Sequence, residues 1–467
     1  MGTITSIMDI AQQALMANQE ALNVTSNNVA NQNTAGYTRE VVNFQAVDAV
    51  TLSRGTSGSG VTATAASQRD RVLEQRVQQQ TQTQSQSAAL ESALQQVQNI
   101  FGLSSTTNSA SATVLGTSID SFFSSLSSLT STPSDTATRQ SVLTAANTLA
   151  AAFNSASNQL SQVSASLNQQ VAGDVGQVNS LTKTIASLNA QIASISPNAD
   201  AGSLEDQRQQ AIAQLSQLVG LDQISTENNG ITLTTSNGAV LVSGGQSFAL
   251  STTQVGGVTH ILAGAGGQDV TSNLTGGDLG GVLQARDQKL PAYQSALDSL
   301  AFAVGTQVNQ QNELGTDGNG NPGAALFSLP PVPAGAAALI QVATADPNAV
   351  AAAATGEGSA GNTNASALAD LSSANIMGGQ TASAFLASFL GQIGGDTAAA
   401  TTDNSAQKTT LTQLTAQRDS FSAVALDEEA ANLTQYQRAY QAAAQVFNIG
   451  NSIMASALNL GVQTTVT

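Results

Sequence analysis

The chain has 467 residues, of which 41% are hydrophobic, 3% aromatic and 9% charged, with no cysteine and no tryptophan. This length suits roughly two to four domains, and the apolar content excludes a wholly disordered chain. The net charge of −17 argues against binding to nucleic acids or anionic membranes, while the absence of cysteine excludes disulfides and thiolate chemistry.

Apolar residues recur every seven positions at both ends of the chain. A repeat of this kind predicts a coiled-coil seam. Neither series has a second helix nearby in the sequence, so we expect the first helix to pack against the last. The expected terminal coiled-coil core domain comprises residues 1–40 and 426–467. Its two seams are Met8, Leu15, Leu22 and Val29, and Leu426, Leu433, Tyr440, Phe447 and Met454.

The first twenty residues carry no export leader that we recognise. MGTITSIMDIAQQALMANQE lacks a basic segment, an uninterrupted apolar core and a small-residue cleavage site, so we expect no Sec-type signal peptide. No stretch approaches about 20 consecutive apolar residues, and the sequence therefore predicts no membrane span.

The segment after the first helix alternates between helical and extended patterns. Residues 38–66 contain Gly and Ser punctuation and read as a connector of short strands, and residues 68–101 and 118–129 as helices. From Thr138 to Ile195 an apolar stripe at steps of three and four predicts one helix of roughly 90 Å if it is unbroken. Gly173 and Gly176 are candidate interruptions. This helix indicates an elongated structural protein.

The pattern then changes to period two. Ser203–Asp206 resembles a capping box at a helix start, and after it Ile231 and Leu233, a turn at Asn237-Gly238, and Val240 predict a β-hairpin. Residues 282–314 and 367–420 return to helix, and 315–365 show little periodicity. We therefore expect a mainly α protein with an inserted β module. The expected divisions are a helical rod domain of residues 41–222, 276–320 and 367–425, and a β-rich outer domain of residues 223–275 and 321–366.

Two features have the form of a chemical site. Asp317-Gly318-Asn319-Gly320-Asn321 begins like a calcium loop, but Pro322 and Ser328 stand where such a loop needs Gly and Glu, so a plain turn is expected. His260 is the single histidine, and no G-x-S-x-G motif precedes it. The sequence predicts no catalytic, cofactor-binding or metal-binding residues, and hence no enzyme and no cofactor.

The two ends carry motifs whose local chemistry can be interpreted directly. The Asn-rich run before Tyr37 is suited to stop the first helix, because Asn bonds its own backbone and Gly36 can adopt a positive φ. Asp427 is expected as an N-cap, with Glu428 and Glu429 at the positive end of the helix dipole.

These same runs carry a family resemblance. NNVANQNTAGYTR at 27–39 resembles the N-terminal signature of bacterial flagellar rod, hook and hook-associated proteins. ALDEEAANLTQYQRAYQA at 425–442 is similar to the more selective signature of the first hook-associated proteins, which join hook to filament. GGDLGG at 276–281 and the segment 309–327 agree in order. Ala423 and Ala425 depart from the Gly and Asn usual for that family.

The resemblance implies a structural subunit that joins hook to filament by helical self-assembly through its terminal helices. It implies partners in the hook protein, the next hook-associated protein, further copies of this chain and an export chaperone at the C-terminal helix. It also implies an extracellular flagellar location, without nucleic acid or membrane partners. Alternatives are another axial protein of hook or rod type, or a secreted glycan-binding or hydrolytic protein. The expected assembly residues are the two seams with Asn31, Gly36 and Tyr37.

Overall fold

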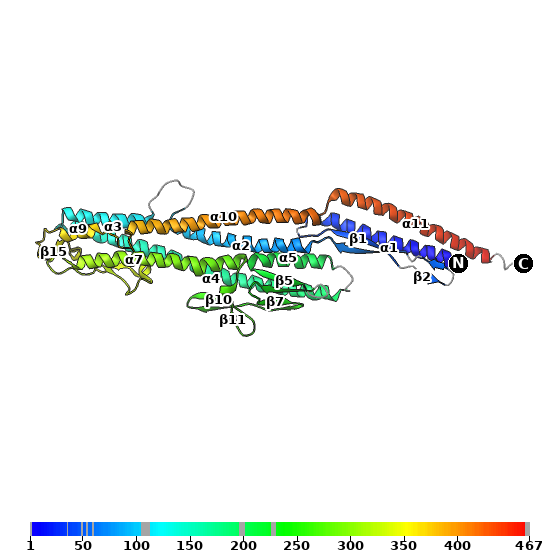
Figure 1. Cartoon of the computed structure of the whole chain (residues 1–467), viewed down its shortest axis with the longest axis horizontal. Coiled ribbons are helices and arrows are strands. Elements are labelled where there is room, and N and C mark those ends of the chain that lie inside the picture. The colour runs from blue at the N-terminus through cyan, green and yellow to red at the C-terminus, as the bar shows by residue number, and fades with distance from the viewer. Residues whose placement is uncertain are drawn as a thin grey trace.

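The computed structural model describes residues 2–34, 36–47, 50–52, 55–57, 60–103, 113–195, 201–225 and 230–462. The molecule is long and narrow, with both chain ends at the same end of it (Figure 1). The described part of the chain has no helix with the length and apolar character that a bilayer crossing requires.

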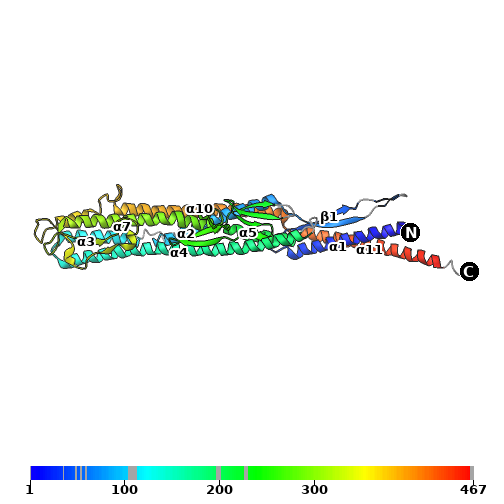
Figure 2. The ribbon, with the colours of Figure 1, turned by 90° about the horizontal axis from the view of Figure 1, so that it is seen from below.

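A terminal body forms the end that carries both termini. Its two helices lie side by side, and a two-stranded ribbon packs against the first of them (Figure 2). The ribbon is antiparallel and in register from Glu40 opposite Ser67 to Ala46 opposite Val61. Its elements are α1 (Gly2–Asn31), β1 (Glu40–Ala46), β2 (Val50–Leu52), β3 (Gly55–Ser57), β4 (Val61–Ser67) and α11 (Leu426–Val462).

The predicted pairing of the first helix with the last is therefore confirmed. The expected boundary of the rod at residue 41 is wrong, because β1 and β4 pair with each other and β4 packs on α1. An extended ribbon with one apolar face needs a neighbouring surface, and the nearest helix of the same body supplies it.

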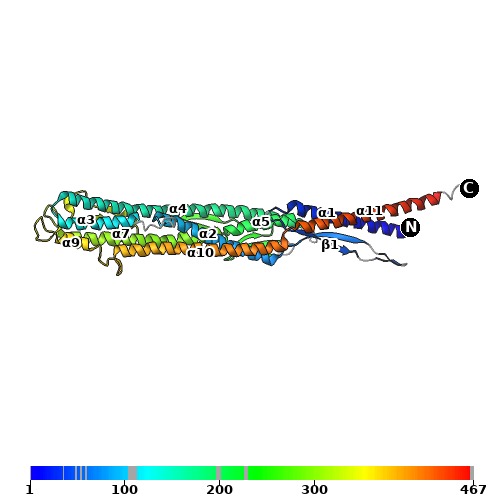
Figure 3. The same ribbon diagram turned by 90° about the horizontal axis from the view of Figure 1, so that it is seen from above.

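The rod is a bundle of long helices that continues from the terminal body (Figure 3). Gly173 and Gly176 lie on the exposed side of its longest helix and do not interrupt it. The buried stripe of that helix includes Leu149, Phe153 and Val171, as its periodicity predicts. The elements are α2 (Arg71–Ile100), α3 (Val114–Ser131), α4 (Thr136–Ser194), α5 (Ser203–Leu218), α6 (Gly277–Gln284), η2 (Ala285–Lys289), α7 (Leu290–Glu313) and α10 (Ala382–Ser422).

The long helix α10 has two different halves. Its first half packs through apolar residues such as Phe389 and Ile393, whereas its second half faces α2 through carboxamides. Gln80 Nε2 donates to Gln407 Oε1 at 2.7 Å, and Gln84 Nε2 to Asn404 Oδ1 at 3.0 Å. The contact between α2 and α10 is therefore polar on the side of the terminal body.

The β module lies against one flank of the rod, on α4. It contains a four-stranded sheet in the order β5-β6-β7-β8 and a three-stranded sheet in the order β11-β10-β9. The predicted turn at Asn237-Gly238 joins β6 to β7, and Gly238 has a φ of 86°. The elements are β5 (Leu221–Ser225), β6 (Ile231–Thr235), β7 (Val240–Ser243), β8 (Gln246–Ser247), β9 (Ser251–Val255), β10 (Val258–Ala263), β11 (Gln268–Asp269) and η1 (Thr271–Asn273).

The segment 321–366 does not join this module, contrary to the expected outer domain. It packs on α4, α7 and α3 at the far end of the rod, where its strands form two separate two-stranded sheets. The buried guanidinium of Arg139 helps to hold it there by donating to the carbonyl oxygen of Val350. The elements are β12 (Gly315–Thr316), β13 (Phe327–Ser328), α8 (Ala336–Leu339), β14 (Gln341–Val342), η3 (Pro347–Ala349), β15 (Ala353–Ala354) and α9 (Thr363–Asp370).

Candidate assembly site in the terminal body

Few apolar side chains are buried in the described part of the terminal body. The buried apolar residues of α1 are Ala11, Ala17, Ala21 and Val24. Gly450 of α11 lies directly on Met8, since a Cβ added to it would stand 3.0 Å from Met8 Cγ. The cluster that forms the main hydrophobic core runs through the rod, the module and the far end, and includes none of these α1 residues. The terminal body therefore has only a thin core of its own.

The predicted seam residues are mostly half-buried in the single chain. Met8 is the seam residue that lies on Gly450 of α11. Leu15, Leu22 and Val29 are half-buried. Met8, Asn31, Tyr37, Leu433, Phe447 and Met454 are also half-buried, whereas Gly36, Leu426 and Tyr440 are exposed.

A second set of apolar residues on α11 faces away from α1. Val446, Ile449 and Ile453 follow at steps of three and four, so they share one face, and they are 46%, 60% and 49% exposed. On α1, Ile7 and Met16 are 50% and 59% exposed. We call Val446, Ile449 and Ile453 the outer face of α11.

Asn28 lies at the centre of the contact between the turn after α1 and the start of α11, where the terminal body meets the rod. We call this contact the joint. Its Oδ1 accepts from the Tyr37 hydroxyl at 2.8 Å and from the Glu40 amide at 3.0 Å. Its Nδ2 donates to the Glu40 carbonyl at 2.8 Å and to Glu429 Oε2 at 3.3 Å. All four hydrogen-bonding positions of this buried amide are used. The turn after α1 is thereby tied to the start of α11.

Arg39 completes this joint with two ion pairs. Its Nε lies 2.7 Å from Glu429 Oε1, and its Nη2 lies 2.9 Å from Glu428 Oε1. The side chain of Glu429 is only 2% exposed, whereas that of Glu428 is 56% exposed. The pair with Glu429 is therefore the one removed from water.

Electrostatics at the joint favour the charged arginine and the neutral tyrosine. Burial lowers the pKa of Arg39, but the hydrogen bonds and charges of Glu428 and Glu429 outweigh it, and the net pKa is raised. Burial, with the charges of Glu40, Asp206 and Glu429, raises the pKa of Tyr37. Tyr37 is therefore an uncharged hydrogen-bond donor across the physiological pH range.

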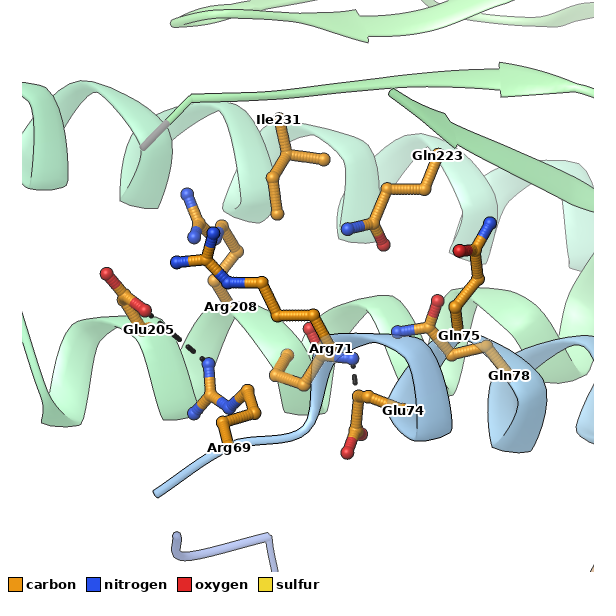
Figure 4. Close-up of a pocket in the computed structure, with 10 residues that line it drawn as sticks. Arg69, Arg71, Glu74, Gln75, Gln78, Glu205, Arg208, Gln223 and Ile231 are labelled. Carbon is orange, nitrogen blue, oxygen red and sulfur yellow. Dashed lines mark hydrogen bonds and ion pairs between the residues drawn. The ribbon is translucent and has the colours of Figure 1, made fainter. Parts of the chain in front are cut away.

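A second layer of ion pairs connects the joint to the rod. Arg69 pairs with Asp206, and its Nη1 lies 3.6 Å from Glu205 Oε2. Asp206 also accepts from the Thr38 amide at 3.2 Å. Figure 4 shows Arg69 and Glu205 facing each other at the edge of a small pocket between α2, α5 and the β module. Burial lowers the pKa of Arg208 in this pocket to about 10.

The sequence interpretation missed this joint because its members are hundreds of positions apart. The Asn-rich run that contains Asn28 was assigned to a helix stop and Glu428 and Glu429 to the helix dipole, while Arg39 was given no role of its own. Glu429 is buried and ion-paired, which a dipole role does not require. Asp427 is the second residue of α11 instead of its N-cap, since the helix begins at Leu426. A signal was present in the lone Arg39 that ends the Asn/Gly/Tyr run.

The other two candidate sites have ordinary structural roles. Asp317 Oδ1 accepts from the backbone amides of Asn319 at 2.8 Å and Asn321 at 2.7 Å, which makes a plain turn. His260 Nδ1 lies 2.7 Å from Asp269 Oδ2 on the neighbouring strand. Within the described ranges, no three His, Cys, Asp or Glu side chains are grouped so that they could hold a metal ion.

Comparisons with known proteins place these features in a family. The model of the flagellar hook-associated protein FlgK helical domain matches residues 94–327. The two ends match broader models: the flagella basal body rod protein at residues 8–38, and the C-terminal part of the flagellar basal body rod FlgEFG proteins at residues 416–460.

Full-length relatives agree with these models. Flagellar hook-associated protein 1 of Escherichia coli (strain K12) is 26% identical over 98% of this chain and 100% of its own. Its counterpart in Bacillus subtilis (strain 168) is 29% identical over 97% of each chain. The solved structure of the flagellar hook junction protein FlgK from Burkholderia pseudomallei matches with a TM-score of 0.68 and 20% identity, covering 74% of this chain and 99% of that chain. At that identity the last match supports the fold alone.

Proposed function

Because this chain belongs to the FlgK family of flagellar hook-associated proteins, and is thus a structural component at the hook–filament junction and not an enzyme, we propose that its terminal body is the part that polymerises. The shared matches at the two ends fit an axial protein that assembles with other flagellar components. The FlgK helical domain distinguishes it from a hook or rod subunit.

The observation that carries this proposal is the mismatch between the two faces of α11. In the described part of α11 no apolar side chain is fully buried, whereas the outer face leaves Val446, Ile449 and Ile453 largely in water. Burying one such side chain contributes about 1.5–3 kcal/mol, so three of them leave a substantial driving force unused in the monomer. Contact with neighbouring subunits would release it.

The predicted seam then has two roles. Its half-buried members pair the two helices within one chain and present their exposed sides to neighbouring subunits. These residues are Met8, Leu15, Leu22, Val29, Leu433, Phe447 and Met454. Leu426 and Tyr440 are exposed and available to a second chain. We propose that Asn31, Gly36 and Tyr37 act on assembly through the joint, by fixing the direction in which the terminal body leaves the rod.

We further propose three kinds of partner for this surface. The hook protein and the next hook-associated protein would contact the terminal body from either side along the axis, in an extracellular flagellum. An export chaperone would cover α11 before assembly, since an exposed apolar helix face is an aggregation hazard.

Hook attachment tests the proposal. The double variant Ile449→Asp/Ile453→Asp should fold as a monomer with unchanged circular dichroism, because both side chains are exposed. It should fail to bind purified hook ends under the electron microscope. Leu339→Asp is the matched control, since Leu339 is 61% exposed at the far end of the rod.

Two outcomes would contradict the proposal. The double variant could decorate hook ends as well as the unchanged protein does, or a chain without residues 1–37 and 427–467 could still attach. Either result would place the assembly surface on the rod or the module.

A further inference from the structure

Two carboxyl groups lie close together where α6 begins against α4. Asp174 lies in the middle of α4 and is only 6% exposed. Its Oδ2 is buried and has no hydrogen-bond donor among the described residues. Gln170, one turn earlier on α4, donates from its Nε2 to Asp278 Oδ2 at 2.6 Å, which places the half-buried carboxyl of Asp278, in the first turn of α6, beside Asp174. A hydrogen bond between two carboxyl groups needs a proton on one of them.

The backbone of α6 is packed closely on its neighbours at two points. Gly277 has a φ of 64°, and a Cβ there would overlap the backbone of Leu218 and Val219. Gly281 is packed equally closely on α2, where a Cβ would overlap the carbonyl oxygen of Gln86. Moving the whole of α6 away from Asp174 would therefore disrupt this packing.

Many charged side chains on the elements that pack against α4 have other partners. On η2, Arg286 binds Asp287 and Lys289 binds Asp396, and on β10 His260 binds Asp269. On α5, Arg208 binds Asn189, and Glu205 and Asp206 pair with Arg69. On α2 and α7, Glu91 accepts from Asn404 and Asp298 from the Ala337 amide. None of these bonds is to Asp174.

We propose that Asp174 and Asp278 share one proton, and that this pair makes the contact between α4 and α6 a pH-sensitive element of the rod. The contact is closed while the proton is held and is weakened when both groups ionise. Two adjacent carboxylates repel each other when both are charged, and the burial of Asp174 weakens the screening of that repulsion by water. The inference concerns the rod and is independent of how the terminal body assembles.

The direction of the pH effect follows from the pKa. Burial, and then the hydrogen bond and charge of Asp278, raise the pKa of Asp174 to about 7. An aspartate in an unfolded chain ionises near pH ~4. Between these values the folded protein binds more protons than the unfolded chain, so this group's contribution to stability falls as the pH rises from about 4 to about 7.

Thermal denaturation of the full chain between pH 5 and pH 9, in EDTA, tests the proposal. Asp174→Asn removes the shared proton and one charge while keeping the size of the side chain. The Tm of this variant should exceed that of the unchanged protein at pH 8, and the difference should shrink towards pH 5. Asp403→Asn, an exposed aspartate on α10, is the matched control and should give curves parallel to the unchanged protein.

Three results would overturn the inference. The curves of Asp174→Asn and the unchanged protein could be parallel across the range. Calcium could raise the Tm of the unchanged protein at pH 8 and not that of Asp174→Asn, in which case the pair would hold a cation instead of a proton. If Asp174→Asn does not fold, infrared spectra of the unchanged protein decide: a protonated carboxyl band at pH 6 should disappear by pH 9, and its absence at pH 6 refutes the shared proton.

Discussion

Replacing Arg39 with methionine should loosen the terminal body while leaving the rod intact. Methionine keeps an unbranched, largely apolar side chain but is shorter than arginine and lacks the guanidinium. Glu429 would then keep one weak donor, Asn28 Nδ2 at 3.3 Å, and would lose its ion pair at 2.7 Å. Glu428 would lose its partner too, but it is 56% exposed and can be solvated.

The magnitude follows from the burial of Glu429. Removing one partner of a buried ion pair costs about 3–5 kcal/mol, because the remaining charge stays out of water. We expect the lower end, about 3 kcal/mol, since Asn28 still donates to Glu429. Removing an exposed partner costs at most about 1 kcal/mol, so Glu428→Gln should have little effect.

Hydrogen exchange measures this difference locally. In the monomer, amides of α1 and of the first half of α11 should exchange roughly 100-fold faster in Arg39→Met than in the unchanged protein, since about 1.4 kcal/mol corresponds to a tenfold change. Amides of α4 provide the internal reference and should not change. Arg39→Met/Glu429→Leu should recover much of the protection, because an apolar pair of similar volume replaces the buried charges.

Two results would refute this reasoning. Equal effects of Arg39→Met and Glu428→Gln would mean that the exposed pair is as important as the buried one. Faster exchange throughout α4 would mean that the joint stabilises the whole molecule instead of the terminal body.

Two further predictions concern the rod and its far end. Gly281→Ala should lower the free energy of unfolding by about 1–3 kcal/mol or more, because the added methyl group overlaps Gln86 and Ala89. Gly173→Ala should raise the free energy of unfolding by about 0.5–1 kcal/mol, because this position of α4 is exposed with open space around it. Urea unfolding of both variants checks this, and equal effects would contradict the close packing of α6 on α2. Asp317→Ala should lower the free energy of unfolding by about 1–2 kcal/mol through the loss of two hydrogen bonds. Calcium should leave the Tm of the unchanged protein unaltered. A calcium-dependent Tm that Asp317→Ala abolishes would instead identify the loop as a metal site.

The shape of the molecule could be predicted from local patterns to a large extent. The apolar stripe from Thr138 to Ile195 predicted a rod helix, and the structure has α4 as one unbroken helix of 59 residues. The hairpin at Asn237-Gly238 was predicted equally well. Both depend on interactions between residues close in sequence, which periodicity and turn chemistry describe directly.

The domain boundaries could not be predicted in the same way. The Ala- and Gly-rich segment 321–366 was grouped with the β module, yet it packs at the opposite end of the rod. Composition reports which elements a segment can form but not which distant surface it covers. That choice depends on contacts such as the one between Arg139 and Val350, which are 211 positions apart.

The pairing of the two terminal helices, the long helical rod after them and the resemblance to flagellar axial proteins can all be read from the sequence. The meeting of Asn28 and Arg39 with Glu429, and of Asp174 with Asp278, became visible only in the folded chain. Both meetings have the same cause. A repeat or a motif constrains residues a few positions apart, whereas a buried hydrogen bond or a shared proton depends on the direction from which a remote helix arrives.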